Sequence, residues 1–187
     1  MKVNVYDFDG TIYNGDSSID FFKFCIKKNK KCLLILPKLF FYYILYFLKK
    51  KNKTEVKEVF FSFLNYFDDI SNIINDFWSK YYRKIKIFYL EKKHDKDIII
   101  SASPEFLLKP VCDKLKIKEL IASKVDLKTG EFLSLNCKGQ EKVDRLFNKY
   151  KSIKIIETYT DSYSDKPLID LANNAYLVSK NKIKKIK

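Results

Sequence analysis

The second half of the sequence alternates short apolar runs with helix-like segments, and this alternation constrains the fold more than any other feature. The run Asp97-Ile98-Ile99-Ile100 is rich in β-branched residues and bounded by polar ones, which is typical of a buried parallel strand. Further strands are predicted at 119–127, from 132 onward, at 153–159 and at 175–178, and helices at 104–115, 139–150 and 167–173. Strands that alternate with helices indicate a parallel α/β sheet.

The first half of the chain has a different character. Residues 2–8 predict one strand that ends at Asp7, whereas residues 16–90 look helical throughout, lack glycine and contain a single proline, Pro37. Asp16 is a candidate N-cap for the first of these helices. We therefore expect two units, an α/β core formed by 1–15 and 91–187 and an inserted all-α cap formed by 16–90.

Polar side chains gather at the predicted ends of the strands. Ligands of open α/β sheets bind outside the carboxyl ends of the strands, so these side chains are candidates for one site. They are Asp7 and Asp9 after the first strand, Ser101 after the second, Lys142 at a helix start, and Asp161 with Asp165 after a late strand. This set offers carboxylates for a hard cation, a hydroxyl and an ammonium for phosphate oxygens, and a carboxylate nucleophile.

Four segments resemble, in the same order, the motifs of the haloacid dehalogenase superfamily. The first is Asp7-Phe8-Asp9-Gly10-Thr11, which matches the signature Asp-x-Asp-x-Thr. The others are Ile98-Ile99-Ile100-Ser101-Ala102-Ser103, Gly139-Gln140-Glu141-Lys142 and Thr160-Asp161-Ser162-Tyr163-Ser164-Asp165. One Asp-x-Asp arises easily by chance, but the four together extend across most of the chain. The resemblance implies a Rossmann-like core of parallel strands flanked by helices, with an inserted helical cap.

The same resemblance implies a magnesium-dependent phosphatase that acts on a small phosphate monoester. Asp7 would attack phosphorus and form an aspartyl-phosphate, and Asp9 would serve as the general acid and base. The implied ligands of Mg²⁺ are Asp7, Asp9 and Asp161, with Asp165 as an outer ligand. The implied phosphate-binding residues are Thr11, Ser101, Ala102 and Lys142, with Lys138 as a rival to Lys142.

A helical insertion after the first motif resembles the phosphoserine-phosphatase-like branch of the superfamily. Asp16 falls where phosphoserine phosphatases place an acid that binds the substrate. Those enzymes bind the substrate carboxylate with an arginine of the cap. The one arginine of the expected cap is Arg83, which lies near its end, and a lysine, Lys57, is found where that arginine would be sought. The sequence therefore disfavours phosphoserine and leaves the substrate undefined.

Residues 32–48 form a strongly apolar segment that is flanked by lysines and interrupted at Pro37. Spanning a bilayer takes about 20 apolar residues, and one crossing would separate Asp7 from Ser101 and Asp161. A single span is excluded if those three form one site. The favoured interpretation is that the segment forms the core of the cap. The alternative is a shallow interfacial helix on an anionic membrane, which would suit a membrane-surface lipid-phosphate phosphatase.

The net charge of +14 raises a rival from another class, a basic nucleic-acid-binding module without catalysis. Only Arg83 and Arg145 are arginines, however, and arginine is the preferred residue for recognising phosphates and base edges. Solvated faces rich in lysine explain the charge better, so we expect no specific nucleic-acid partner.

The four cysteines suggest a reducing compartment. Cys25, Cys32, Cys112 and Cys137 show no Cys-x-x-Cys spacing, and buried thiols are the simplest interpretation. No signal-peptide pattern precedes the first strand. We therefore expect a cytoplasmic protein, with peripheral contact to a membrane as the alternative, and the oligomeric state stays open.

Overall fold

A six-stranded, mostly parallel sheet forms the centre of the computed structural model, which describes residues 1–180 and 182–187. Its strands are β1 (Lys2–Tyr6), β2 (Ile98–Pro104), β3 (Glu119–Ser123), β4 (Lys154–Thr160), β5 (Asn174–Ser179) and β6 (Lys182–Lys185). Their order is β3-β2-β1-β4-β5-β6, and all neighbours are parallel except β5 and β6. The predicted α/β class is confirmed, whereas β6 has no counterpart among the predicted strands.

Strand β1 lies between β2 and β4, with both faces buried. Side chains alternate along a strand, so Val3 and Val5 pack into one hydrophobic cluster while Tyr6 packs into the other. Parallel strands end at the same edge of a sheet. Residues near the carboxyl ends of β1, β2 and β4 are therefore brought together there, although they are far apart in the sequence.

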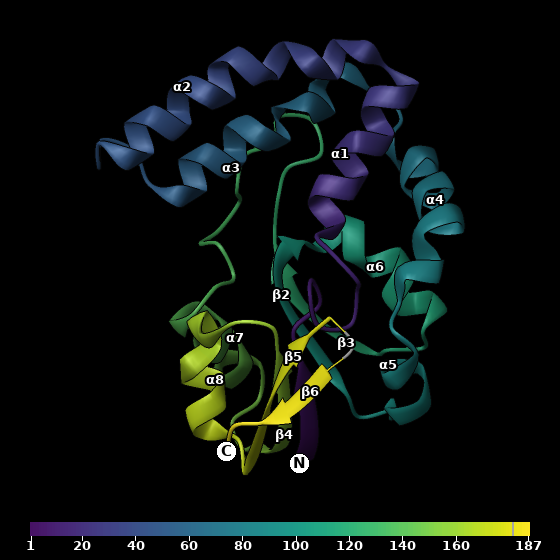
Figure 1. Cartoon of the computed structure of the whole chain (residues 1–187), viewed down its shortest axis with the longest axis vertical. Helices are drawn as coiled ribbons and strands as arrows, with labels where there is room; N and C mark the ends of the chain where they lie inside the picture. Colours follow the sequence, from purple (N-terminus) through teal and green to yellow (C-terminus); the bar gives the residue numbers. More distant parts are fainter. Residues whose placement is uncertain (181) are drawn as a thin grey trace.

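Helices cover both faces of this sheet (Figure 1). On one side lie α7 (Gln140–Lys149) and α8 (Lys166–Leu171), whose Leu146 and Leu168 pack in the cluster that contains Val5. A short 3-10 turn, η4 (Tyr163–Asp165), precedes α8. On the other side lie α6 (Glu105–Lys114) and α5 (Ile87–Lys92).

The chain between β1 and β2 is helical, as its sequence pattern predicts. Its elements are α1 (Ser17–Lys28), η1 (Lys30–Ile35), α2 (Leu36–Phe47), α3 (Lys53–Phe61), η2 (Ser62–Tyr66), α4 (Ile70–Tyr81), η3 (Tyr82–Lys84) and α5. Side chains cap three of the α-helices, because Asp16, Asn52 and Asp69 each accept hydrogen bonds from the first turn of α1, α3 and α4.

This helical block shares its core with the sheet. Phe21 and Phe77 from the block lie in the same buried cluster as Tyr6 of β1. The indole N–H of Trp78 in α4 donates to the backbone carbonyl of Leu107 in α6 at 2.6 Å. One continuous apolar cluster thus anchors the block to the face of the sheet that carries α6.

The strand predicted from residue 132 onward is reduced to a single antiparallel bridge between Phe132 and Val125, and β3 ends at Ser123. The Asp126 carboxylate accepts two backbone hydrogen bonds from the turn that follows, at 2.9 and 2.7 Å. Beyond that turn, the Phe132 N–H donates to the Glu58 carboxylate of α3 at 3.1 Å. The prediction was wrong because this segment docks on the helical block instead of extending the sheet.

Helix α2 contradicts the favoured interpretation of residues 32–48 as the core of a cap. Cys32 and Ile35 are buried just before it, but α2 itself contains no buried residue. Its Phe40 and Phe47 are 69% and 78% exposed. The reason is its position, since α2 crosses one end of the molecule and its outward face has no further layer over it (Figure 1). Among the described residues, no helix is long and apolar enough to cross a bilayer.

We expect Gly130→Ala to destabilise the protein more than Gly139→Ala. Both glycines have positive φ, +79° and +60°, so alanine is strained at either position. A Cβ on Gly130 would also lie 2.5 Å from the backbone of Phe61, whereas a Cβ on Gly139 would meet no atom closer than 3.7 Å. In chemical denaturation, the free energy of unfolding should therefore fall by at least about 1 kcal/mol more in Gly130→Ala than in Gly139→Ala. Equal losses would show that close packing of this turn on α3 contributes nothing.

Candidate active site

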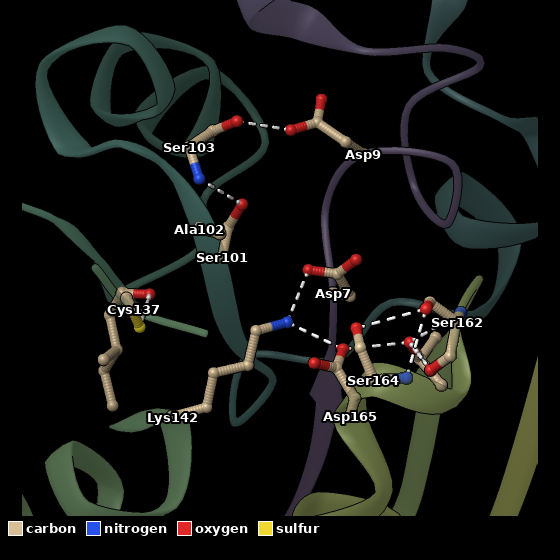
Figure 2. A network of polar contacts seen from close by, with 12 residues as sticks. Asp7, Asp9, Ser101, Ala102, Ser103, Cys137, Lys142, Ser162, Ser164 and Asp165 are labelled. Carbon is tan, nitrogen blue, oxygen red and sulfur yellow. Dashed lines mark hydrogen bonds and ion pairs between the residues drawn. The ribbon is translucent and has the colours of Figure 1, made fainter. Parts of the chain in front are cut away.

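Asp7 follows β1 directly, at the edge of the sheet where ligands of open α/β folds bind. Its backbone N–H donates to the carbonyl of Tyr159 in β4 at 2.9 Å, which fixes the end of the strand. Its carboxylate accepts a hydrogen bond from Nζ of Lys142 at 2.8 Å. Figure 2 shows the lysine reaching from α7 to the carboxylates that follow β1 and β4.

Lys142 holds two carboxylates at once, because Nζ also donates to Asp165 at 2.7 Å. The ammonium is buried, which disfavours its charge, but Asp7 and Asp165 outweigh that effect and raise the pKa of Lys142 above its ordinary value. The rival Lys138 is exposed and lines the same cavity. Lys142, and not Lys138, contacts Asp7 in the structure.

Asp165 and Asp161 follow β4 but take different positions. Asp165 is buried and also accepts a hydrogen bond from Oγ1 of Thr160 at 2.9 Å, and its side chain makes no capping bond to α8. Asp161 is exposed and packs on Gly10. A Cβ on Gly10 would lie 2.1 Å from Oδ2 of Asp161, and φ is +69° there, so only glycine lets the two loops approach this closely.

Asp9 is held by groups other than those around Asp7. Its Oδ1 accepts the backbone N–H of Ser17 at 2.6 Å, at the start of α1, and its Oδ2 accepts the hydroxyl of Ser103 (Figure 2). Burial and the neighbouring Asp16 raise the pKa of Asp9 to about 7, although both hydrogen bonds lower it. Asp9 is therefore a carboxyl group that keeps its proton close to neutral pH.

The pKa of Asp7 is also raised, to about 6. Burial is the main cause, and the carboxylates of Asp165 and Asp161 add to it, while Lys142 opposes it. Partial desolvation of the Asp161 carboxylate at the cavity and the charge of Asp165 likewise raise the pKa of Asp161, while Lys142 and Lys86 oppose this. Three carboxylates thus lie near the ammonium groups of Lys142 and Lys86, and the site carries an excess of negative charge.

The phosphate-binding candidates do not all reach the cavity. Ser101 lines it, and its hydroxyl accepts the N–H of Ser103 at 3.1 Å. Ala102 lines it as well, and its carbonyl accepts a hydrogen bond from Lys57 at 2.9 Å. Thr11 is fully buried in the tight turn after Phe8 and does not line the cavity. The structure does not bring Thr11 to the cavity with the other candidates, and phosphate binding by Thr11 stays a prediction.

A cavity of about 590 Å³ joins these residues to the helical block. On the sheet side it is lined by Asp7, Asp9, Ser101, Ala102, Ser103, Lys142, Asp161, Ser162, Ser164 and Asp165. On the helical side it is lined by Asp16, Ser18 and Ile19, by Leu39, Tyr43 and Tyr46 of α2, and by Lys53, Val56, Lys57, Phe60 and Phe61 of α3. Lys138 completes the wall, and a site of this size accepts a molecule larger than phosphate.

Asp16 and Lys57 both lie at this cavity, but Arg83 does not. Asp16 caps α1, where it accepts the N–H of Ile19 at 2.9 Å. Ser103 and Lys53 were not among the predicted site residues. The repeated serine of Ser101-Ala102-Ser103 was the available signal for the first, whereas Lys53 is one of many lysines and gave none.

The residues present fit a magnesium ion. Among the residues that the structure describes, no three acidic, histidine or cysteine side chains form a ready-made metal cage. Mg²⁺, however, usually binds through one or two carboxylates and completes its shell with water and substrate phosphate. Asp7 and Asp161 supply such carboxylates at the cavity. Burial is the main cause of their raised pKa values, and neighbouring carboxylates add a repulsion that a divalent cation would offset.

Solved structures with the same fold include a protein of unknown function from Bordetella pertussis, with a TM-score of 0.77, 15% identity, and coverage of 93% of this chain and 88% of that chain. A phosphoserine phosphohydrolase-like protein from Francisella tularensis gives a TM-score of 0.56 and 18% identity, with coverage of 94% and 86%. A probable phosphoserine phosphatase from Vibrio cholerae gives a TM-score of 0.64 and 11% identity, with coverage of 94% of this chain and 55% of that chain. No curated protein matches the sequence significantly.

A family model described as haloacid dehalogenase-like hydrolase matches residues 5–170. The matched stretch begins in β1, ends in α8 and contains all four motif segments. It therefore includes every carboxylate and ammonium group described above. The chain belongs to the haloacid dehalogenase-like hydrolase family.

Proposed function

We propose that this hydrolase is a magnesium-dependent phosphatase that cleaves a phosphate monoester through an aspartyl-phosphate on Asp7. One observation carries the proposal. Asp7, paired with the buried ammonium of Lys142, shares one cavity with Asp9, a carboxyl group whose pKa is about 7. A nucleophile, a proton donor and a cation for phosphate oxygens are the groups that phosphoryl transfer requires.

The two steps follow from these roles. A carboxylate oxygen of Asp7 forms a bond to phosphorus while the bond from phosphorus to the ester oxygen breaks, and the proton of Asp9 passes to that oxygen. Water then attacks phosphorus, Asp9 takes the proton of that water, and Asp7 is regenerated with release of inorganic phosphate. Ser101 and Lys142 stabilise the phosphoryl oxygens during both steps.

Mg²⁺, held by Asp7, Asp161 and the backbone carbonyl of Asp9, would neutralise charge on the phosphate oxygens. Asp165 supports this arrangement from outside, since it orients Lys142 at 2.7 Å. In this assignment Gly10 keeps Asp161 close to the loop after β1.

Residues 16–90 act as the cap in this proposal, and 1–15 with 91–187 as the catalytic core. The support is that α2 and α3 supply one wall of the cavity while the sheet edge supplies the other. Asp16 lies at the cavity and is our candidate for a contact with the leaving group. A cytoplasmic location fits the cysteines, all four of which are buried and unpaired.

A nucleic-acid-binding module is the weaker alternative. The guanidinium of Arg145 is already used in hydrogen bonds within the protein, to the Glu141 carboxylate at 2.7 Å and to the carbonyl of Ala122 at 2.7 Å. Arg83 is then the remaining arginine for base or phosphate recognition. The charge itself accounts for attraction of small anionic substrates.

We expect Asp7→Asn to lower the kcat for an aryl phosphate by at least about 1,000-fold, because the variant lacks the nucleophile. Wild-type activity should depend on added Mg²⁺ and disappear with EDTA. Asp95→Asn, which changes an exposed carboxylate outside the cavity, is the matched control and should retain wild-type activity. Metal-independent activity, or an active Asp7→Asn, would refute the assignment.

The wild-type kcat/KM for an alkyl phosphate should fall above about pH 7, because Asp9 must be protonated to donate. Ser103→Ala removes a hydrogen bond that lowers the pKa of Asp9, so its alkaline limb should move to higher pH. An aryl phosphate is the control. Its leaving group needs less protonation, so its kcat/KM should fall less at alkaline pH. A limb that moves to lower pH in Ser103→Ala contradicts the role of Asp9.

A lipid phosphate at a membrane surface is the second candidate substrate, and α2 favours it. The helix exposes apolar residues on its outward face, while its Leu39, Tyr43 and Tyr46 line the cavity. Residues 21–54 contain ten lysines and no Asp or Glu. Anionic lipids complement this charge, whereas a second copy of the same face would repel it.

We expect the protein to co-sediment at low salt with phosphatidylglycerol vesicles and not with phosphatidylcholine vesicles. The double variant Phe40→Ser/Phe47→Ser should weaken binding at least about tenfold, because two exposed phenyl groups no longer insert. Leu133→Ser/Leu135→Ser changes side chains that are 66% and 73% exposed elsewhere and should bind like the wild type. Absence of binding to anionic vesicles would remove this candidate.

A further inference from the structure

Three lysines line the cavity in addition to Lys142. Lys53 and Lys57 lie one turn apart on α3, and Lys138 lies just before α7. They come from two elements that are far apart in the sequence and meet only because α3 lies against the edge of the core. None of the three belongs to the groups that the proposed phosphoryl transfer uses.

These lysines are close to one another and have no carboxylate partner in the described part of the chain. Lys138 and Lys53 line the same cavity, and the charge of Lys53 disfavours the charge of Lys138. Lys57 donates to neutral oxygens, the carbonyl of Ala102 at 2.9 Å and Oδ1 of Asn136 at 3.3 Å. Elsewhere in the molecule, exposed lysines such as Lys28 and Lys109 do pair with nearby acids.

This arrangement is electrostatically unfavourable without a ligand. Burial, together with the charges of Lys53 and Lys138, lowers the pKa of Lys57 to about 8, although Asp16 and Asp9 oppose the effect. Partial desolvation of the ammonium at the cavity and the neighbouring charge of Lys53 also lower the pKa of Lys138. An anion bound between the three ammonium groups would relieve their repulsion and restore their charge.

We propose that Lys53, Lys57 and Lys138 bind a second phosphate group of the substrate. The substrate is then a phosphate monoester that carries another phosphate, as a monoester or diester, a few bonds from the scissile one. This inference rests on the proposed function for the identity of the scissile group. The cavity of about 590 Å³ has room for such a molecule, because its lining extends from Asp7 to α2 and α3.

Phosphate fits this cluster better than carboxylate does. A planar carboxylate is matched by the fork of arginine, and no arginine lines the cavity in the described residues. Lysine ammonium groups are compact charges that approach from separate directions, as the oxygens of a tetrahedral phosphate allow. Simple attraction of anions to a basic protein would not require lysines gathered inside the cavity.

A matched series of three-carbon substrates tests the inference. Propyl phosphate, the phosphate ester of 3-hydroxypropionate and propane-1,3-diol bisphosphate differ only in the terminal group, which is methyl, carboxylate or phosphate. We expect the wild-type kcat/KM for the bisphosphate to exceed that for propyl phosphate by at least about tenfold, as one charge-assisted hydrogen bond would give. Lys53→Met and Lys138→Met should each remove most of this preference and leave propyl phosphate within about twofold of wild type.

Lys23→Met, an exposed lysine on α1 outside the cavity, is the control and should keep the preference. Equal rates for the three substrates, a preference for the carboxylate, or an equal loss on all substrates in Lys53→Met would overturn the inference. Calorimetric binding of the bisphosphate in EDTA separates it from the proposed function. Tight binding in EDTA that is weakened by Lys53→Met would support the lysine site, and failure to hydrolyse any of the three substrates once Mg²⁺ is added would separately reject the phosphatase assignment. No binding of the bisphosphate would reject the site.

Discussion

The buried ammonium of Lys142, which donates to Asp7 at 2.8 Å and to Asp165 at 2.7 Å, is the interaction on which the rest of the site depends. It links α7 to the ends of β1 and β4, so three segments far apart in the sequence are fixed relative to one another. Removing one partner of such a buried group leaves the other charges uncompensated, which is strongly unfavourable. The interaction therefore holds the fold together at the point where the chemistry is proposed to occur.

The charges around this lysine divide the cavity into two regions. Carboxylates outnumber cations near Asp7, Asp161 and Asp165, which is the condition for binding a divalent metal. Lysines without acidic partners gather on the opposite wall, around Lys53 and Lys138, which is the condition for binding an anion. A phosphorylated substrate that is oriented by both regions would present its phosphorus to the carboxylate side.

The sequence predicts the sheet well because buried β-branched runs and the order of the motifs are local properties. It also identifies most residues that meet at the sheet edge. What it misses depends on packing between distant segments. Thr11 is buried away from the cavity, Ser103 donates to Asp9, and the ring of Phe132 packs on Phe61 of α3. The apolar composition of α2 likewise predicts burial, but its position at one end of the molecule leaves it exposed.

The central claim is that Asp7 carries the phosphoryl group. The most direct measurement is mass spectrometry of Asp9→Asn, quenched with acid during turnover of an aryl phosphate, whose leaving group needs no proton. Asp9→Asn lacks the base for the second step, so the intermediate should accumulate. We predict one phosphoryl group on the peptide that contains Asp7. A phosphoryl group on another residue, or hydrolysis without any phosphorylated enzyme, would contradict the account.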